Sequence, residues 1–260
     1  MAQSQTSPEQ KEIRDDRGVL HVLTERLGGG GQGTAYRTQD PRVLVKLVEL
    51  PAERAQERKA RQDRLRLIAR LGLQDRLPLA VPESLVETDE SIGYTMRMLE
   101  DMVPLSELLR IPSASVGRWY KETGGLRRRL RLLAELADVM AALHGEGLVY
   151  GDLSPSNVFV SGSIAEVSTW LIDTDNVRWS IAADTESFFT PPYGAPELVK
   201  ATGPASPSSD AWSLAVLTYQ LLTLNHPFLA GDLVQNGDPE EAEAAAGRGE
   251  LPWVHDTTND

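Results

Sequence analysis

The sequence predicts an α+β fold in two successive parts, an antiparallel sheet that carries one helix and then a mainly helical part. Short runs rich in β-branched residues are concentrated before residue 99, and glycine or polar turns separate them. Apolar residues recur at helical spacing over most of the remaining chain. The change of pattern divides the chain into residues 19–98 and residues 99–260.

The first part is predicted to hold several short strands and one long helix. Residues 1–18 are polar and charged, and we expect them to form a disordered tail. The helix is expected over Ala52–Leu71, where Glu, Arg, Gln and Leu at helical spacing replace the β-branched residues. The strands are expected at Val19–Leu23, Thr34–Arg37, Val43–Leu47, Ser84–Glu87 and Ile92–Met98.

The second part is predicted to be built on helices. We expect helices at Leu105–Arg110, Leu126–Leu143 and Trp212–Leu224, and short strands at Val158–Val160 and Trp170–Ile172. The last of the helices is apolar almost all round, which predicts that it is buried. The glycine- and proline-rich stretch Thr202–Ser209 before it is expected to be a loop.

The composition excludes several classes of function. The 260 residues carry a formal net charge of −12, which disfavours nucleic acid as a partner, and the basic stretches are interpreted as exposed helix faces. No cysteine is present, so the chain has no disulfide, no thiolate metal site and no cysteine nucleophile, and it suits a reducing cytoplasm. No apolar run reaches the roughly 20 residues of a membrane span. We therefore expect a cytoplasmic protein that binds neither membranes nor nucleic acids.

A glycine cluster and a following lysine indicate a phosphate site. Gly28, Gly30 and Gly33 form a G-x-G-x-x-G pattern, in which backbone N–H groups can approach phosphate oxygens. A predicted strand follows the pattern, whereas a dinucleotide-binding loop would be followed by a helix. Lys46 closes the next apolar strand, where its ammonium could reach phosphates. A plain hairpin turn and an ordinary strand-end lysine are the alternatives.

Such a lysine needs a carboxylate partner on the helix that follows it. We expect Glu57 to fill this role, with Glu53 as second choice, although both stand close to Lys46 in sequence.

Three further polar residues point to phosphoryl transfer. Asp152 and Asn157 stand five apart in a predicted loop, a spacing that allows the carboxylate to meet a hydroxyl while the amide turns to a metal ion. Asp173 follows a short apolar strand, and a carboxylate there could complete a site for Mg²⁺. Each residue alone could be a turn, cap or strand-end residue. Together and in this order they favour an enzyme.

These segments together resemble the eukaryotic-like Ser/Thr protein kinases of bacteria, from about Leu20 to Phe228. The resemblance implies a bilobal protein-kinase-like fold with ATP and Mg²⁺ between an N-lobe, residues 19–98, and a C-lobe, residues 99–260. It implies that Asp152 is the catalytic base, that Asn157 and Asp173 bind Mg²⁺, that Lys46 binds phosphate and that the glycines cover the nucleotide. The adenine site is implied to comprise Ala35, Leu44 and the hinge from Met96 to Leu99.

The local sequences GGQGTAYR, VYGDLSPSN and LIDTDN are similar to the subgroup encoded beside a PP2C-type phosphatase and a von Willebrand A protein. The resemblance therefore implies these two proteins as partners, in addition to a protein substrate. The alternatives are a nucleotide-binding pseudokinase or scaffold, and a small-molecule kinase of the aminoglycoside or choline type. The last also uses Gly-Asp-x-x-x-x-Asn, as Gly151 to Asn157 does.

The chain departs from the usual kinase pattern at several positions. Tyr150-Gly151-Asp152 replaces His-Arg-Asp, and the missing arginine predicts activity that does not depend on phosphorylation at Thr185, Ser187 or Ser180. Ser154 stands where these kinases usually have a phosphate-contacting lysine. The residues after Phe228 are fewer than a C-lobe usually has, so we expect the C-lobe to be incomplete at its C-terminus.

Overall fold

The computed structural model describes residues 11–30, 33–181 and 189–229, together with Asp238, Glu241, Ala245 and Glu250. The chain forms two compact units. Unit 1 comprises Met1–Arg76 and Ala80–Glu100, and unit 2 comprises Leu77–Leu79 and Asp101–Asp260.

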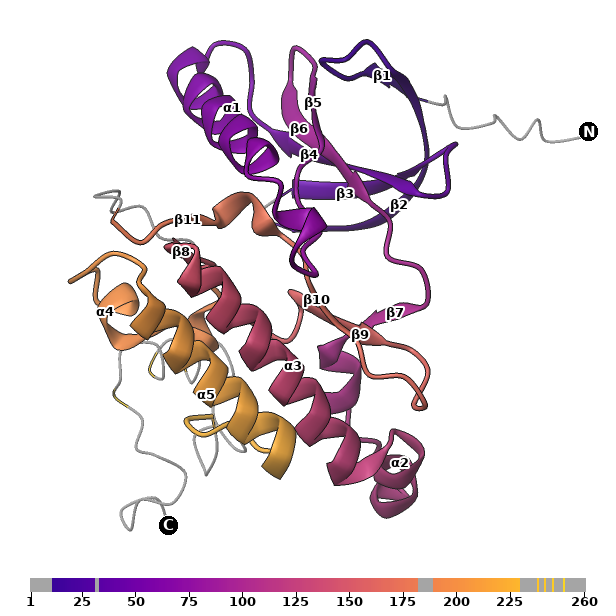
Figure 1. Cartoon of the computed structure of the whole chain (residues 1–260), viewed down its shortest axis with the longest axis vertical. Helices are drawn as coiled ribbons and strands as arrows, with labels where there is room; N and C mark the ends of the chain where they lie inside the picture. The colour runs from indigo at the N-terminus through magenta and orange to yellow at the C-terminus, as the bar shows by residue number, and fades with distance from the viewer. Residues whose placement is uncertain are drawn as a thin grey trace, which may run out of the picture. The chain divides into compact units, whose positions relative to one another are not determined.

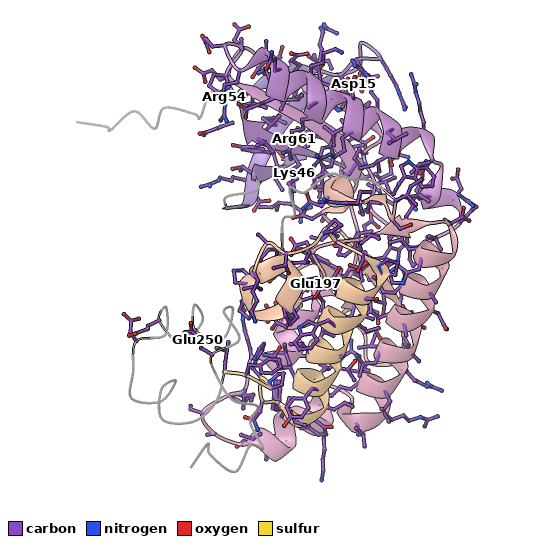
Figure 2. All side chains as sticks on the ribbon, turned by 90° about the vertical axis from the view of Figure 1, so that its left-hand side faces the viewer. Asp15, Lys46, Arg54, Arg61, Glu197 and Glu250 are labelled. Atoms are coloured by element: carbon purple, nitrogen blue, oxygen red, sulfur yellow. The ribbon has the colours of Figure 1, made fainter. Side chains whose placement is uncertain are left out.

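Unit 1 is an antiparallel sheet with the strand order β1-β2-β3-β4-β6-β5 (Figure 1). An isolated bridge between Asp15 and Val86 joins the β1 edge to the β5 edge, so the sheet curls around an apolar interior of Ile13, Leu23, Val45, Leu47 and Val86. The strands are β1 (Glu12–Arg14), β2 (Leu20–Gly30), β3 (Gly33–Thr38), β4 (Val43–Glu49), β5 (Ser84–Glu87) and β6 (Ser91–Arg97).

The prediction of a disordered tail over residues 1–18 is wrong for residues 11–18, and residues 1–10 lie outside the described part of the chain. Ile13 is 4% exposed in the interior of the sheet. The Asp15 carboxylate accepts hydrogen bonds from Val19 N at 2.8 Å and from Ser84 Oγ at 2.8 Å. One apolar residue among charged neighbours gives little sequence signal, but here it anchors a strand.

Helix α1 (Ala55–Arg70) covers the outer face of this sheet (Figure 1). Leu65 of α1 packs against Leu85, Tyr94 and Met96, and Leu44 joins this cluster. The helix begins three residues later than predicted, after Pro51 and a short turn. A short 3₁₀ helix, Leu73–Asp75, follows it.

Arg58 fastens the first half of α1 to the sheet. Its guanidinium is buried and donates hydrogen bonds to the carbonyl of Leu50, to the carbonyl of Thr88 at 2.7 Å and to the Glu87 carboxylate at 2.7 Å. Because these acceptors satisfy the buried cation, an arginine is tolerated at a position that packs like a core residue.

Unit 2 is built on two long helices, α3 (Gly125–Gly145) and α5 (Pro207–Thr223), which pack side by side (Figure 1). The sheet β10-β9-β7 contains β10 (Thr169–Leu171), β9 (Val158–Ser161) and β7 (Met102–Pro104), and β11 (Arg178–Trp179) pairs with β8 (Leu148–Val149). The remaining elements are α2 (Val116–Glu122), α4 (Pro196–Val199) and the 3₁₀ helices Leu105–Leu109, Thr174–Asn176 and Pro191–Tyr193. The helix predicted at Leu105–Arg110 is thus a 3₁₀ turn.

Two predictions about α5 are wrong. The helix begins at Pro207, because Ser206 and Ser209 form a capping box with reciprocal hydrogen bonds, so the predicted loop over Thr202–Ser209 ends earlier. The helix is also not buried all round. Trp212 is 37% exposed and stacks on Phe228 at a centroid distance of 5.8 Å.

The end of α5 is followed by a histidine that organises the next turn. His226 is buried, and its Nε2 lies 3.1 Å from the carbonyl of Pro192. Its Nδ1 accepts hydrogen bonds from the N–H groups of Phe228 and Leu229, both at 3.2 Å. The neutral ring protonated on Nε2 satisfies all these contacts.

Among the described residues, no helix combines the length and the apolar character that a membrane crossing requires.

Candidate active site

The glycine cluster of unit 1 forms the end of a tight hairpin. Gly28 pairs with Ala35 and Gly30 pairs with Gly33, while Gly31 and Gln32 at the tip lie outside the described residues. Gly33 has a φ of 117°, and a Cβ there would lie 2.6 Å from the carbonyl oxygen of Leu47. Glycine is therefore required for this hairpin to lie against β4. A strand follows the pattern, as predicted, and not the helix of a dinucleotide-binding loop.

Lys46 lies on the outer face of the sheet, the face that α1 covers. It is directly opposite Ala35 on β3 and Tyr94 on β6, and its Nζ lies 5.9 Å from the centre of the Tyr94 ring. Leu44 is two residues earlier on the same strand, and residues two apart share a face. Ala35, Leu44 and Lys46, which the sequence predicts to bind the nucleotide, thus lie on one face of unit 1.

The predicted hinge residues differ from one another in their environment. Met96 lies opposite Leu44 within β6 and is 5% exposed in the cluster that contacts α1. It is therefore a core residue of the sheet. Leu99 follows the end of β6 and is partly buried.

The prediction that Glu57 pairs with Lys46 is wrong. Glu57 bonds to Arg54, three residues earlier, with 2.8 Å between Arg54 Nε and Glu57 Oε1, and its side chain is 55% exposed. Asp63, the other acidic residue of α1, lies 3.7 Å from Lys59 and 3.9 Å from Arg66. Both carboxylates of α1 thus pair with basic groups on the solvent side of the helix.

The catalytic segment of unit 2 brings two of the predicted residues together. Asn157 Nδ2 donates to the carboxylate of Asp152 at 3.1 Å and to its backbone carbonyl at 2.9 Å. The second oxygen of the carboxylate accepts from both the N–H and the hydroxyl of Thr190, each at 2.8 Å. Asp152 is 2% exposed, so these donors orient its carboxylate in a nearly dry setting.

Asp173 is joined to this segment through its neighbour. The N–H of Ile172 donates to the carbonyl of Asn157 at 3.0 Å, and the buried Tyr150 hydroxyl donates to the carbonyl of Ile172. Burial raises the pKa of Tyr150 well above its ordinary value, so the phenol stays a donor. Asp173 itself has a φ of 53°, an uncommon conformation that aspartate tolerates and that occurs at functional sites.

The donor set at this position fits Mg²⁺. Asn157 and Asp173 offer an amide oxygen and a carboxylate, and Mg²⁺ is usually held by one or two such protein ligands together with phosphate oxygens and water. Among the described residues, no group of three or more His, Asp or Glu side chains is placed to hold a metal ion.

Asp210 of α5 holds the backbone of the catalytic segment through hydrogen bonds. It is 1% exposed and accepts hydrogen bonds from the N–H groups of Tyr150 and Gly151, both at 2.8 Å, and lies 2.9 Å from His144 Nε2. Asp210 stands in the first turn of α5, but the N-cap of that helix is Ser206. His144 and Thr190 were not predicted, because neither residue stands in a recognisable spacing to Asp152.

Ser154 differs from the neighbouring polar residues in having an unsatisfied side chain. It is 1% exposed, and its hydroxyl has no hydrogen-bond partner among the described residues. Of the residues whose phosphorylation we expect to be dispensable, Thr185 and Ser187 lie outside the described part of the chain.

Comparisons with known proteins relate the chain to bacterial serine/threonine-protein kinases. PkaA of Streptomyces coelicolor, a serine/threonine-protein kinase, is 30% identical over 148 residues, which are 53% of this chain and 27% of that protein. PknD of Chlamydia caviae, also a serine/threonine-protein kinase, is 25% identical over 231 residues, which are 79% of this chain and 24% of that protein. The chain spans about a quarter of the length of these curated relatives.

The family model described as Protein kinase domain matches residues 22–247, well over half of the chain. This match confirms the predicted α+β, bilobal protein-kinase-like fold, and the bacterial kinases among the relatives support the predicted resemblance. The chain therefore belongs to the protein kinase domain family.

Proposed function

We propose that the chain is an ATP-dependent protein kinase that transfers the γ-phosphoryl group to serine or threonine hydroxyls of a protein substrate. The observation that carries the proposal is the network around Asp152, in which Asn157 and Thr190 fix the carboxylate next to the strand end that bears Asp173. Family membership supports the same reaction.

In the proposed reaction, the substrate hydroxyl oxygen attacks the γ-phosphorus, the bond from that phosphorus to the β–γ bridging oxygen breaks, and ADP leaves. The Asp152 carboxylate orients the hydroxyl and accepts its proton. Mg²⁺, when bound, would neutralise charge on the phosphate oxygens, and Asn157 and Asp173 are the side chains that would hold it. On unit 1, the N–H groups of the β2–β3 hairpin and the ammonium of Lys46 would bind the phosphates.

Phosphorylation of the purified chain, incubated with ATP and Mg²⁺ and analysed by mass spectrometry, tests the proposal. Wild-type protein should gain phosphate on itself or on a generic protein substrate, while Asp152→Asn and Asp173→Ala should abolish transfer and keep the wild-type melting temperature. ATP binding without transfer would indicate a pseudokinase. Transfer only to an aminoglycoside or choline would indicate a small-molecule kinase.

We also propose that the chain works in the cytoplasm, which its lack of cysteine suits, and, from the local sequences GGQGTAYR, VYGDLSPSN and LIDTDN, that it acts with a PP2C-type phosphatase and a von Willebrand A protein. If so, the phosphatase should remove the phosphate that the chain adds to itself. Failure of the phosphatase to do so, in an assay where it acts on another phosphoprotein, would contradict this partnership.

A further inference from the structure

Helix α3 carries two adjacent arginines that are buried near its start. Arg128 and Arg129 are 5% and 0% exposed. Among the residues that the structure describes, no carboxylate pairs with either guanidinium. The acceptors of their hydrogen bonds are the Thr123 hydroxyl and the carbonyls of Leu108, Thr123, Gly125 and Ser161. A buried cation bonded only to uncharged oxygens is poorly compensated, and burial lowers the pKa of both arginine side chains.

Thr123 contacts both guanidinium groups. Its hydroxyl oxygen accepts hydrogen bonds from Nη1 and Nη2 of Arg129 at 3.4 and 3.3 Å, and its carbonyl accepts from Nη1 of Arg128 at 3.2 Å. These distances exceed the usual value of about 2.9–3.0 Å, so the neutral hydroxyl is a weak acceptor for Arg129. The Nε of each arginine has no hydrogen-bond partner among the described residues. A negatively charged group on the Thr123 oxygen would therefore find several donors close by.

The start of α3 adds to the attraction for an anion. Gly124 is the N-cap residue of this helix, and it makes no side-chain capping bond. The first N–H groups of a helix have no partner within the helix, and together with the helix dipole they favour a negative charge. Thr123 directly precedes the N-cap. An anion on its side chain would thus be attracted by two guanidinium groups and by the uncapped end of a helix of 21 residues.

Thr123 is partly buried and stands in a turn that can open. Helix α2, which immediately precedes it, contains no buried residue. Two glycines with positive φ follow it and give the backbone of the turn conformational freedom. The Arg129 guanidinium lies 4.2 Å from the ring centre of Tyr120 and 5.5 Å from that of Trp119, both on α2. A short helix with so little buried surface opens locally at a low free energy, which exposes the Thr123 hydroxyl.

We propose that Thr123 is a phosphorylation site and that Arg128 and Arg129 bind the phosphate it receives. The inference rests on the proposed function, which supplies ATP as the phosphate donor. The Thr123 hydroxyl oxygen attacks the γ-phosphorus, ADP leaves, and the hydroxyl proton passes to the Asp152 carboxylate. A phosphate carries a charge of about −1.5 to −2 and three acceptor oxygens, so charge-assisted hydrogen bonds replace the weak bonds to the hydroxyl. The modification thereby fastens the turn after α2 to α3.

The acceptor hydroxyl and the catalytic base lie at opposite ends of α3. Figure 1 shows α2 at one end of this helix and β8 at the other. At the β8 end, His144 of α3 lies 2.9 Å from Asp210, which accepts hydrogen bonds from the backbone just before Asp152. A helix of 21 residues is about 30 Å long. Because this length separates the two groups within one chain, the phosphate is passed from one copy of the chain to another.

The first test incubates the wild-type chain with ATP, Mg²⁺ and a tagged Asp152→Asn acceptor, and maps the phosphates of the acceptor by mass spectrometry. Thr123 of the acceptor should be phosphorylated. The second test compares melting temperatures. A chain synthesised with phosphothreonine at position 123 should melt about 4 °C or more above the unmodified chain. Arg129→Lys, which keeps a charge but loses the planar donors, should reduce this gain.

The matched control is phosphothreonine at position 202. Thr202 is exposed in the same unit, and its hydroxyl bonds to the carbonyl of Glu197 and to no arginine. Phosphate there should not raise the melting temperature. An equal gain at both positions would indicate a general effect of charge and would overturn the inference, as would a melting temperature that phosphate on Thr123 leaves unchanged or lowers.

The outcomes also separate this inference from the proposed function. Transfer to other residues or to a generic substrate, with none to Thr123, would overturn the inference and leave the kinase activity intact. Absence of transfer to any protein would remove the proposed function. The melting temperature of the chain with phosphothreonine at position 123 would then decide the site by itself, and a gain would assign its phosphate to a different kinase.

Discussion

Replacing Asp210 with alanine should destabilise unit 2 and the catalytic segment together. The carboxylate accepts two backbone hydrogen bonds at 2.8 Å, from Tyr150 and Gly151, and lies 2.9 Å from His144 Nε2. Alanine leaves both backbone donors buried without an acceptor, at about 1–3 kcal/mol each, and His144 loses its partner as well. We expect a total loss of about 4 kcal/mol. That is a large share of the roughly 5–15 kcal/mol by which a domain is stable.

Thermal unfolding followed by circular dichroism measures this loss. At roughly 2–4 °C per kcal/mol for a chain of this size, the melting temperature of Asp210→Ala should fall by about 8–16 °C. Asp210→Asn retains one acceptor oxygen and should fall by about half as much. Asp138→Ala, an exposed aspartate on α3, is the control and should stay within about 0.5 kcal/mol of wild type. A melting temperature of Asp210→Ala close to that of wild type would refute the reasoning.

Three further predictions follow from other contacts. Gly93→Ala would place a Cβ 2.9 Å from the carbonyl carbon of Lys46 and still closer to its oxygen. We therefore expect the free energy of unfolding to fall by about 3 kcal/mol or more in thermal unfolding, and a near-wild-type melting temperature would contradict this. Burial lowers the pKa of His226 from 6.5 to about 4, so its neutral ring contributes about 3 kcal/mol above pH 6.5, and this contribution is lost as the pH falls from 6.5 to 4. Urea unfolding at pH 7 and pH 4.5 should show this acid-dependent loss in wild type and a smaller one in His226→Asn; equal losses would oppose it. Thr190→Val removes one of the donors to Asp152 and should lower kcat about 10-fold at unchanged KM for ATP, while Thr190→Ser should restore it, and an unaffected kcat would exclude the proposed positioning.

The order of elements in unit 1 was accessible from the sequence because short runs rich in β-branched residues, separated by turn residues, indicate strands. The strand β1 was missed for the opposite reason. It contributes a single core side chain, Ile13, and is held by the side chain of Asp15, which no local pattern reveals. In α5, apolar composition indicated a helix correctly but overestimated its burial, since Trp212 stacks on Phe228 in a partly exposed position.

The residues expected at the site likewise fall into those that a local pattern identifies and those that depend on tertiary packing. Asp152, Asn157 and Asp173 stand in short segments whose spacing is itself the signal, and the structure brings Asp152 and Asn157 into hydrogen-bond contact. The choice of Glu57 failed because it required knowing which side of α1 faces the sheet. The side of α1 that faces the sheet is marked by the buried residues Arg58 and Leu65. Because polarity alone would place an arginine on the solvent side, it could not identify the buried side of this helix.

The hydrogen bonds of Arg58 have a consequence for how this domain could be regulated. Helix α1 cannot move away from the sheet without breaking the hydrogen bonds that Arg58 donates to the carbonyls of Leu50 and Thr88, which would lose this donor. Helix α1 and its sheet should therefore open as a single cooperative body, and amide hydrogen exchange in α1 should be as slow as in β4 and β6. Regulation by displacement of this helix away from its sheet is accordingly disfavoured.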